Sequence, residues 1–439
     1  MVKHLPSAVL LLLGIVPAQT PAQAPHAELE QALAAYFADE RATSATLAPV
    51  LKLARGNEAL LVDVLHTKSF VPKTGPVDAR GMLDASYRFV ASAPARAGQE
   101  DNEFRLAGPA GGDALHPLVV YVPDATSTNL FARELHESGS EAGRFVFLVP
   151  DEKRDNLYAP SAHEHQLVAG PLRTLLLTLP IDPDRVYLIG SGRGGHVTWD
   201  VGFTAADRWA AIFPCNGGLV HEGGWKASGG VFLGNAKSFA VFTVFNTSFD
   251  HGIESSRYAV KKFREWSFLI DATEEPRMRT MGVTEAMAKL APVRRDAHPR
   301  RIEKRFNHLA DGGHYWLRAL DRTKEWDPAA RINVKAAWPA DRDQQLEVVW
   351  AAVRDLCGHL AGTIAGNRIE ITAHGMRRLR VYLDPEIVNF EAPVTIVVNG
   401  KVVRTLKPAR QPEVMLQHVH ETGDTSRLYF AFVDVSVGG

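Results

Sequence analysis

The residues with the clearest chemical potential lie in a glycine-rich turn between a strand-like and a helix-like segment. The turn, residues 190–194, reads Gly-Ser-Gly-Arg-Gly and follows an apolar run over residues 185–189. In a nucleophile elbow, G-x-S-x-G, small flanking residues permit a strained turn that presents a central serine at the head of a helix. Here the central position falls on Gly192, and Ser191 stands one residue early. Glycine carries no nucleophile, so the pattern predicts an elbow without its reactive group.

Three segments around this turn carry a resemblance to a known family. They are DPDR at residues 182–185, GRGGH at 192–196 and DRWAAIFPCNGG at 207–218. These segments resemble the α/β-hydrolase superfamily, and most closely its secreted carboxylesterase- and peptidase-like members, which include polyhydroxyalkanoate depolymerases and feruloyl esterases. The resemblance covers about residues 84–300. It implies an esterase fold with a catalytic triad in the chain order serine, aspartate, histidine.

The other two triad positions have candidates later in the chain. Asp250 follows a strand-like run over residues 239–245 and resembles the acid loop of the family, although a helix-capping aspartate would give the same pattern. His314, in the segment DGGHYW, resembles the family's Gly-Gly-His loops, or it lies on the first strand of a C-terminal domain. An alternative active site therefore combines Asp250 and His314 with Ser191 as a displaced nucleophile.

The residues expected to surround the turn also depart from the family pattern. After the strand-like run over residues 117–122 the family usually has His-Gly, whereas this chain has Pro123 and Asp124. Proline has no N–H to donate, and an aspartate would repel a developing oxyanion. Arg193 stands at the head of the predicted helix, where it could bind a carboxylate or sulfate. Arg193, Gly192 and Asp124 are therefore the candidate ligand-binding residues of the cleft.

Two histidine clusters have the composition of metal ligands. They are His163-Glu164-His165 and the segment with His418, His420 and Glu421. On a strand, His418 and His420 would share one face and form a usable pair of ligands. Neither cluster has a third ligand at a typical spacing, so we expect no metal. The turn over residues 190–194 also lacks the lysine of a phosphate loop, and we expect no cofactor.

The elements that must position these residues follow two different patterns. Near-continuous apolar runs, alternating with helical stretches such as 172–179, predict an α/β fold with a mostly parallel sheet flanked by helices. The predicted strands are residues 87–92, 117–122, 144–149, 185–189, 209–213 and 239–245. A helix over 344–360 and antiparallel strands predict a small C-terminal domain like a β-sandwich, with a hairpin turn at Asn399 and Gly400. These later strands are residues 367–373, 377–383, 394–398, 401–406 and 427–435.

The predicted organisation begins with a leader. Lys3, an apolar run over residues 8–16 and small residues after it are typical of a signal peptide over residues 1–24, cleaved after residue 18 or 24. The remaining units are a helical lead-in with a linker at 26–80, the hydrolase-like domain at 84–300 and the β-rich domain at 301–439. We therefore expect an exported protein, periplasmic or extracellular, with no transmembrane segment.

Composition limits the classes of function. The chain has 439 residues, with Lys+Arg 49 against Asp+Glu 50, and this balance argues against a nucleic-acid partner. The two cysteines, Cys215 and Cys357, exclude a metal site built mainly of thiolates. Whether the two cysteines pair stays open at this point. We expect a catalytically degenerate protein with a small-molecule, ester or peptide ligand in its cleft; the alternatives are an active esterase or peptidase that uses Ser191, and an interaction protein whose β domain binds protein or carbohydrate.

Overall fold

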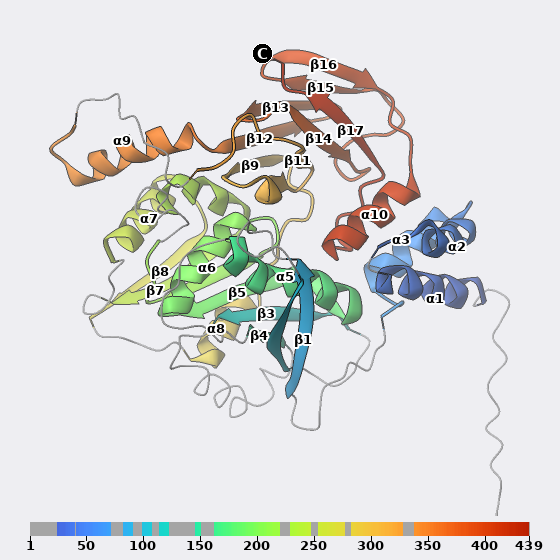
Figure 1. Ribbon diagram of the computed structural model, residues 1–439, viewed down its shortest axis with the longest axis horizontal. Coiled ribbons are helices and arrows are strands. Elements are labelled where there is room, and N and C mark those ends of the chain that lie inside the picture. The colour runs from blue at the N-terminus through green and yellow to red at the C-terminus, as the bar shows by residue number, and fades with distance from the viewer. Residues whose placement is uncertain are drawn as a thin grey trace, which may run out of the picture.

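The computed structural model shows an α/β body, a C-terminal pair of β-sheets and three N-terminal helices (Figure 1). It describes residues 24–39, 41–71, 82–90, 99–107, 114–122, 145–150, 162–219, 229–246, 253–276, 282–327 and 338–438. The predicted signal peptide lies outside these ranges except for Ala24, so it stays a prediction. Among the described residues, no helix has the length and apolar character needed to cross a bilayer.

One eight-stranded sheet forms the centre of the α/β body. Its strand order is β1-β2-β4-β3-β5-β6-β7-β8. Strands β3 to β8 run parallel, while β2 pairs antiparallel with both β1 and β4. The bounds are β1 Met82–Val90, β2 Gln99–Ala107, β3 His116–Val122, β4 Val146–Pro150, β5 Ile181–Ser191, β6 Ala211–Cys215, β7 Ala240–Asn246 and β8 Ile270–Glu275. The predicted mostly parallel sheet is therefore confirmed.

Helices cover both faces of this sheet, which explains the continuous apolar runs in its strands. In β5, Leu188 belongs to the core that includes residues of α5, α6 and α7, whereas its neighbour Ile189 belongs to the core that includes α8. Successive side chains of a strand point to opposite faces, so the two cores lie on opposite sides of the sheet. The helices are α5 Ala162–Thr178, α6 Arg193–Thr204, α7 Ile253–Glu265 and α8 Val283–Leu290, with a 3₁₀ segment, η3, at Gly229–Ser238.

The C-terminal part is a sandwich of two smaller sheets. Their strand orders are β10-β11-β14-β17 and β16-β15-β13-β12-β9, and side chains of both sheets enter one shared core. The bounds are β9 Arg301–Phe306, β10 Gly313–His314, β11 Leu317–Ala319, β12 Gly358–Ala365, β13 Arg368–His374, β14 Arg378–Leu383, β15 Val394–Val398, β16 Lys401–Leu406 and β17 Ala431–Ser436. The predicted hairpin joins β15 to β16, with positive φ at both Asn399 and Gly400.

Several predicted details of this part are wrong. The pairing of β13 with β15 is parallel, not antiparallel. The helix α9 spans Arg342–Arg354 and ends before the strand β12, which the predicted helix over 344–360 had overrun. Helix α9 also packs on the α/β body, because the Trp350 ring lies against Gly230 of η3 and edge-on to Tyr258 of α7. His418 and His420 lie on a helix, α10 at Pro412–Thr422, and not on a strand.

The N-terminal helices pack beside α10 in Figure 1 and share the core of the sandwich. They are α1 Ala24–Ala38, α2 Ser44–Ala54 and α3 Glu58–Thr67. The ring of His420 on α10 lies 5.2 Å from that of Tyr36 on α1, and its Nε2 lies 2.6 Å from the carbonyl oxygen of Asp39. The helical lead-in therefore covers α10 rather than the large sheet.

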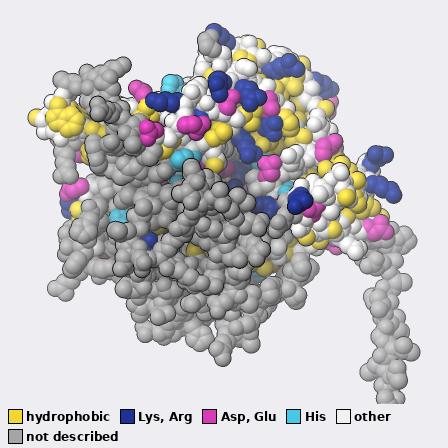
Figure 2. Space-filling view, in the orientation of Figure 1, with side chains coloured by type: hydrophobic (Ala, Val, Ile, Leu, Met, Phe, Trp, Pro, Cys, Tyr) yellow, Lys and Arg dark blue, Asp and Glu magenta, His cyan; other side chains and the backbone are white. Residues whose placement is uncertain are grey.

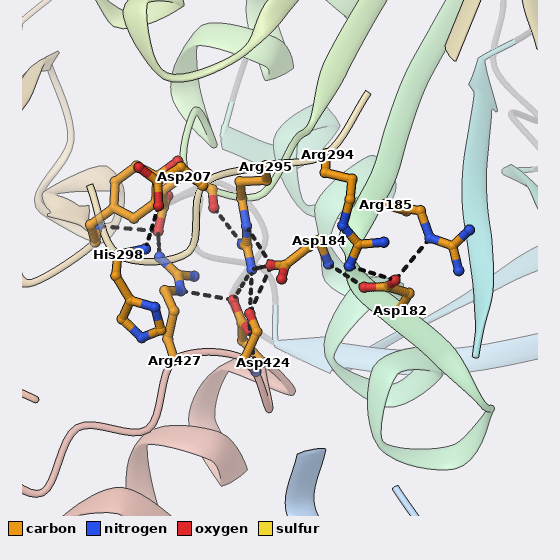
Figure 3. A network of polar contacts seen from close by, with 12 residues as sticks. Asp182, Asp184, Arg185, Asp207, Arg294, Arg295, His298, Asp424 and Arg427 are labelled. Carbon is orange, nitrogen blue, oxygen red and sulfur yellow. Dashed lines mark hydrogen bonds and ion pairs between the residues drawn. The ribbon is translucent and has the colours of Figure 1, made fainter. Parts of the chain in front are cut away.

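A buried ionic network fastens the sandwich to the α/β body (Figure 3). Arg295 lies between Asp184, near the start of β5, and Asp424, which follows α10. Its guanidinium nitrogen is 2.8 Å from a carboxylate oxygen of Asp184 and 2.9 Å from one of Asp424. Arg427 then joins Asp424 to Asp207, which follows α6, at 2.7 Å on both sides. Burial opposes the charge on Asp424, but Arg295 and Arg427 hold the pKa of that carboxyl below its usual range. The network fixes α10 against the end of α6.

Candidate functional site

The glycine-rich turn joins β5 to α6 at the carboxyl end of the large sheet. Gly192 adopts φ 55° and ψ −116°, a backbone conformation that is strained for a residue with a side chain. Its N–H donates a hydrogen bond of 2.8 Å to the carbonyl oxygen of Cys215, at the end of β6. The helix α6 begins at the next residue, Arg193. The sharp turn of the elbow is therefore centred on a residue that has no side chain.

The neighbouring glycines are required by close packing. A Cβ on Gly190 would lie 2.0 Å from the carbonyl oxygen of Gly194 and 2.4 Å from the hydroxyl of Thr198, both on α6. Gly195 and Gly217 meet in the same way, because a Cβ on Gly217 would lie 2.5 Å from the backbone of Gly195. These contacts bring the first turn of α6 directly onto the ends of β5 and β6.

Ser191 is the last residue of β5 and pairs with Cys215 of β6. Gly190 faces α6, so the alternation of the strand places the Ser191 side chain on the opposite face of the sheet, the face of Ile189. The nearest histidine in sequence, His196 on α6, donates from Nδ1 to the carbonyl oxygen of Gly218 at 2.7 Å. Within the described ranges, no histidine is hydrogen-bonded to the Ser191 hydroxyl.

Two predicted site residues, Asp124 and Asp250, lie outside the described residues. Arg193, which was predicted to bind a ligand together with Gly192 and Asp124, is half-buried at the first position of α6. Two buried asparagines that sequence reasoning did not single out lie at the ends of the strands next to the turn. Asn246 ends β7 and donates from Nδ2 to Oδ1 of Asn216, which follows β6, at 3.1 Å. Asn216 has φ 52°, and an asparagine directly after a buried strand was the available signal.

The structure does not bring His314 to Ser191. His314 lies in β10, and its Nε2 is 3.0 Å from the hydroxyl of Ser238, which precedes the amino end of β7. The backbone of the next residue, Tyr315, bonds to Asp207 beyond the C-terminal end of α6. Because α6 has 12 residues, this places His314 about 18 Å along the helix from the elbow. His314 belongs to the start of the C-terminal sheets and is therefore too far from Ser191 to act as the base of the predicted triad of Ser191, Asp250 and His314.

The histidines of the two metal-like clusters lie on helices, α5 and α10. His165 on α5 bonds through Nε2 to Asp200 on α6 at 2.8 Å, and both side chains are buried. His418 and His420 are two residues apart on a helix, so they point in different directions rather than sharing a face. No group of three or more possible ligands that could hold a metal ion occurs within the described part of the chain.

Comparisons with known proteins give likenesses of fold. No family model matches the sequence, and no curated protein sequence matches it either. A thermostable esterase has 20% identity and a TM-score of 0.35, over 47% of this chain and 60% of that chain. An acylaminoacyl peptidase in complex with Z-Gly-Gly-Phe-chloromethyl ketone has 12% identity and a TM-score of 0.35, over 45% of this chain and 37% of that one. The esterase Est2 from Thermogutta terrifontis has 11% identity and a TM-score of 0.37, over 51% and 93%.

This chain spans less than two thirds of the length of the first two of these proteins. The strand order of the large sheet and its turn into α6 define the fold as α/β of the hydrolase type.

Proposed function

We propose that the chain is an α/β-hydrolase-fold protein that lacks serine-hydrolase activity and binds a ligand in the cleft beside the elbow. The observation that carries this proposal is the turn at Gly192. Its φ of 55° and ψ of −116° belong to the strained turn from which a nucleophile would project, and a glycine there projects nothing.

The surroundings of Ser191 support the same proposal. A serine nucleophile needs a general base within hydrogen-bond reach of its hydroxyl. The two histidines placed above are engaged elsewhere, His196 at Gly218 and His314 at Ser238. Beside the turn, Asn216 and Asn246 carry amide groups and Arg193 carries a cation, chemistry that would suit a small polar, ester or peptide ligand.

The test is labelling of the purified protein with a fluorophosphonate, which reacts with activated serines. We expect no labelling of the parent chain or of Ser191→Ala. The matched control is Ser436→Ala, which removes an exposed serine hydroxyl at the end of β17. Labelling of the parent that survives Ser436→Ala and disappears in Ser191→Ala would overturn the proposal and identify Ser191 as a displaced nucleophile.

A second variant, Gly192→Ser, tests whether a general base and oxyanion donors are still present around the turn. A side chain at this φ and ψ costs about 1–3 kcal/mol of strain, so its folding must first be checked by circular dichroism. Labelling gained by Gly192→Ser would support an active site that lacks only its nucleophile. An unlabelled, folded variant would support a cleft that has also lost its base or its oxyanion donors.

We further propose that the chain is exported, on the strength of Lys3 and the apolar run over residues 8–16. Cell fractionation and N-terminal sequencing of the full-length product test this proposal. We expect a mature chain that begins after residue 18 or residue 24. An intact N-terminus in the cytoplasmic fraction would contradict it.

A further inference from the structure

A polar cavity of about 340 Å³ lies at the opposite end of α6 from the elbow. Its walls come from α5, the residues that end and follow α6, strands β9 to β11, and α10. It therefore lies where the sandwich meets the α/β body. Its volume is within the range of small-molecule sites, but its lining carries many charged groups.

Buried ring nitrogens in this cavity have no hydrogen-bond partner among the described residues. His418 on α10 is only 8% exposed, and both of its ring nitrogens are unpartnered. His314 is 1% exposed and uses Nε2 toward Ser238, which leaves its Nδ1 unpartnered. Buried polar atoms of this kind cost free energy unless something bonds to them. Both side chains are among the residues that line the cavity.

Positive charge exceeds negative charge in the described lining. Two of its carboxylates are paired with two of its arginines, Asp207 with Arg427 at 2.7 Å and Glu421 with Arg318 at 2.9 Å. The other charged groups of the described lining are then Arg173, Arg208 and Lys304 against the single carboxylate of Asp311. The guanidinium of Arg173 contacts His420. Even without Arg173, two cations face one carboxylate.

Lys304 and Arg208 lack an ion-pair partner among the described carboxylates. Lys304 on β9 is 2% exposed, and its Nζ donates to the carbonyl oxygen of Gly313 at 2.8 Å. Arg208 is half-buried and reaches only the carbonyl oxygen of Thr422, at 3.5 Å. Burial lowers the pKa of Lys304 despite the nearby carboxylates of Asp207 and Asp311. An anion in the cavity would compensate both cations.

We propose that this cavity, lined by Arg208, Lys304 and His418, binds a small hydroxylated organic anion, a sugar acid or a sugar phosphate. The anionic group lies against Arg208 and Lys304, where charge-assisted hydrogen bonds are strongest. Hydroxyl groups of the ligand face the two histidines. This site is separate from the elbow and does not depend on the function proposed for it.

The hydroxyl groups follow from the chemistry of neutral histidine. Burial lowers the pKa of His418 and of His314 to about 3, so both rings are neutral near pH 7. A neutral imidazole offers one N–H donor and one nitrogen acceptor. Ionised oxygens of a carboxylate or a phosphate dianion accept bonds from the donor but cannot donate to the acceptor. A ligand that satisfies His418 by itself therefore carries a hydrogen-bond donor, such as a hydroxyl group, besides its anionic group.

On the face shown in Figure 2, Lys and Arg side chains are spread over the C-terminal sheets. Asp and Glu side chains lie among them on the same face.

The test is isothermal titration calorimetry of the full chain with three probes: glucose 6-phosphate, glucuronate and uncharged glucose. We expect at least one of the two anions to bind with a stoichiometry of one, and glucose to bind at least tenfold more weakly. The preferred anion tells whether phosphate or carboxylate is the ligand group. Absence of binding by both anions at millimolar concentration, or equal binding of glucose, would overturn the proposal.

Three variants locate the binding. Arg208→Gln removes a cation of the cavity, and His418→Phe keeps a ring in place of the imidazole. Each is expected to weaken binding of the preferred anion at least tenfold. Arg257→Gln is the matched control, because Arg257 is an exposed arginine on α7 paired with Glu274. Unchanged binding in both cavity variants, checked for folding by circular dichroism, would refute this location.

Discussion

The two buried histidines of the cavity make stability depend on pH in a calculable way. Burial lowers the pKa of His418 and of His314 from 6.5 to about 3. In the unfolded chain these rings regain the ordinary value and take up protons as the pH falls below about 6.5. The folded state does not take them up until the pH approaches 3. Their contribution is therefore complete above the unfolded pKa and declines as the pH falls between the two values.

The magnitude follows from linkage. Each histidine costs about 1.4 kcal/mol of unfolding free energy for each pH unit below its unfolded pKa. From about pH 7 to about pH 5 the loss is about 2 kcal/mol for each ring, or about 4 kcal/mol for both. The groups facing His418 are Arg427, Asp424, Asp207 and Arg318, and the carboxylates among them are too few to reverse the effect of burial.

The assay is urea unfolding at both pH values for the parent chain and for His418→Gln, followed by tryptophan fluorescence. The variant is expected to lose about 2 kcal/mol less than the parent on acidification, whatever its stability at neutral pH. His374→Gln, on an exposed position of β13, controls for the loss of a histidine as such. His66 and His420, whose pKa values are lowered, and His298, whose pKa is raised by its bond to Asp384 despite burial, contribute in parent and variant alike. The same loss on acidification in His418→Gln as in the parent would refute the reasoning.

Three further predictions concern the packing. Arg427→Met leaves two buried carboxylates without their shared partner, and it should lower the unfolding free energy by about 3–5 kcal/mol in urea titrations. Gly190→Ala forces a Cβ against backbone and should lower the melting temperature, with a cost of about 1–3 kcal/mol or more, whereas Gly234→Ala, with open space around it, should not. Both cysteines are free and buried, with thiol pKa values raised to about 12, so Ellman's reagent should react with neither in the native chain and with both after denaturation.

Much of the fold could be predicted because its strands are buried on both faces. The apolar runs that became β3, β4 and β5 are local signals of this burial, and the hairpin at Asn399 and Gly400 is specified by residues that tolerate positive φ.

The error at α10 has a definite cause. His418 and His420 were considered only as they would lie on a strand, and the helix was not predicted, although its boundaries were present in the sequence. Pro412 stands at the first position of α10, and Gly423 ends it with φ 74°. Proline at the start and glycine past the end are the usual punctuation of a helix. The apolar positions between them, Val414, Met415, Leu416 and Val419, are all buried.

The two sites differ in how far sequence can specify them. The elbow is built from consecutive residues, so its spacing alone located the turn at Gly192. The cavity joins His165, Arg208, Lys304 and His418, which are brought together only when the sandwich docks on the α/β body. No spacing rule connects such residues, and the sequence therefore left open whether His314 joins the elbow or the first strand of the C-terminal domain.

A glycine-rich turn is by itself weak evidence for catalysis in this fold. Gly190, Gly195 and Gly217 are required where α6 lies against the ends of β5 and β6, because a Cβ at any of them would meet backbone atoms at 2.5 Å or less. These contacts persist whether or not the turn carries a nucleophile. Gly192 differs, since the turn at this position accepts a serine in active enzymes at the cost of strain. A glycine at this position relieves the strain and carries no nucleophile, so packing explains the other glycines of the motif, whereas a reaction at the elbow would need a nucleophile, a base and oxyanion donors from elsewhere.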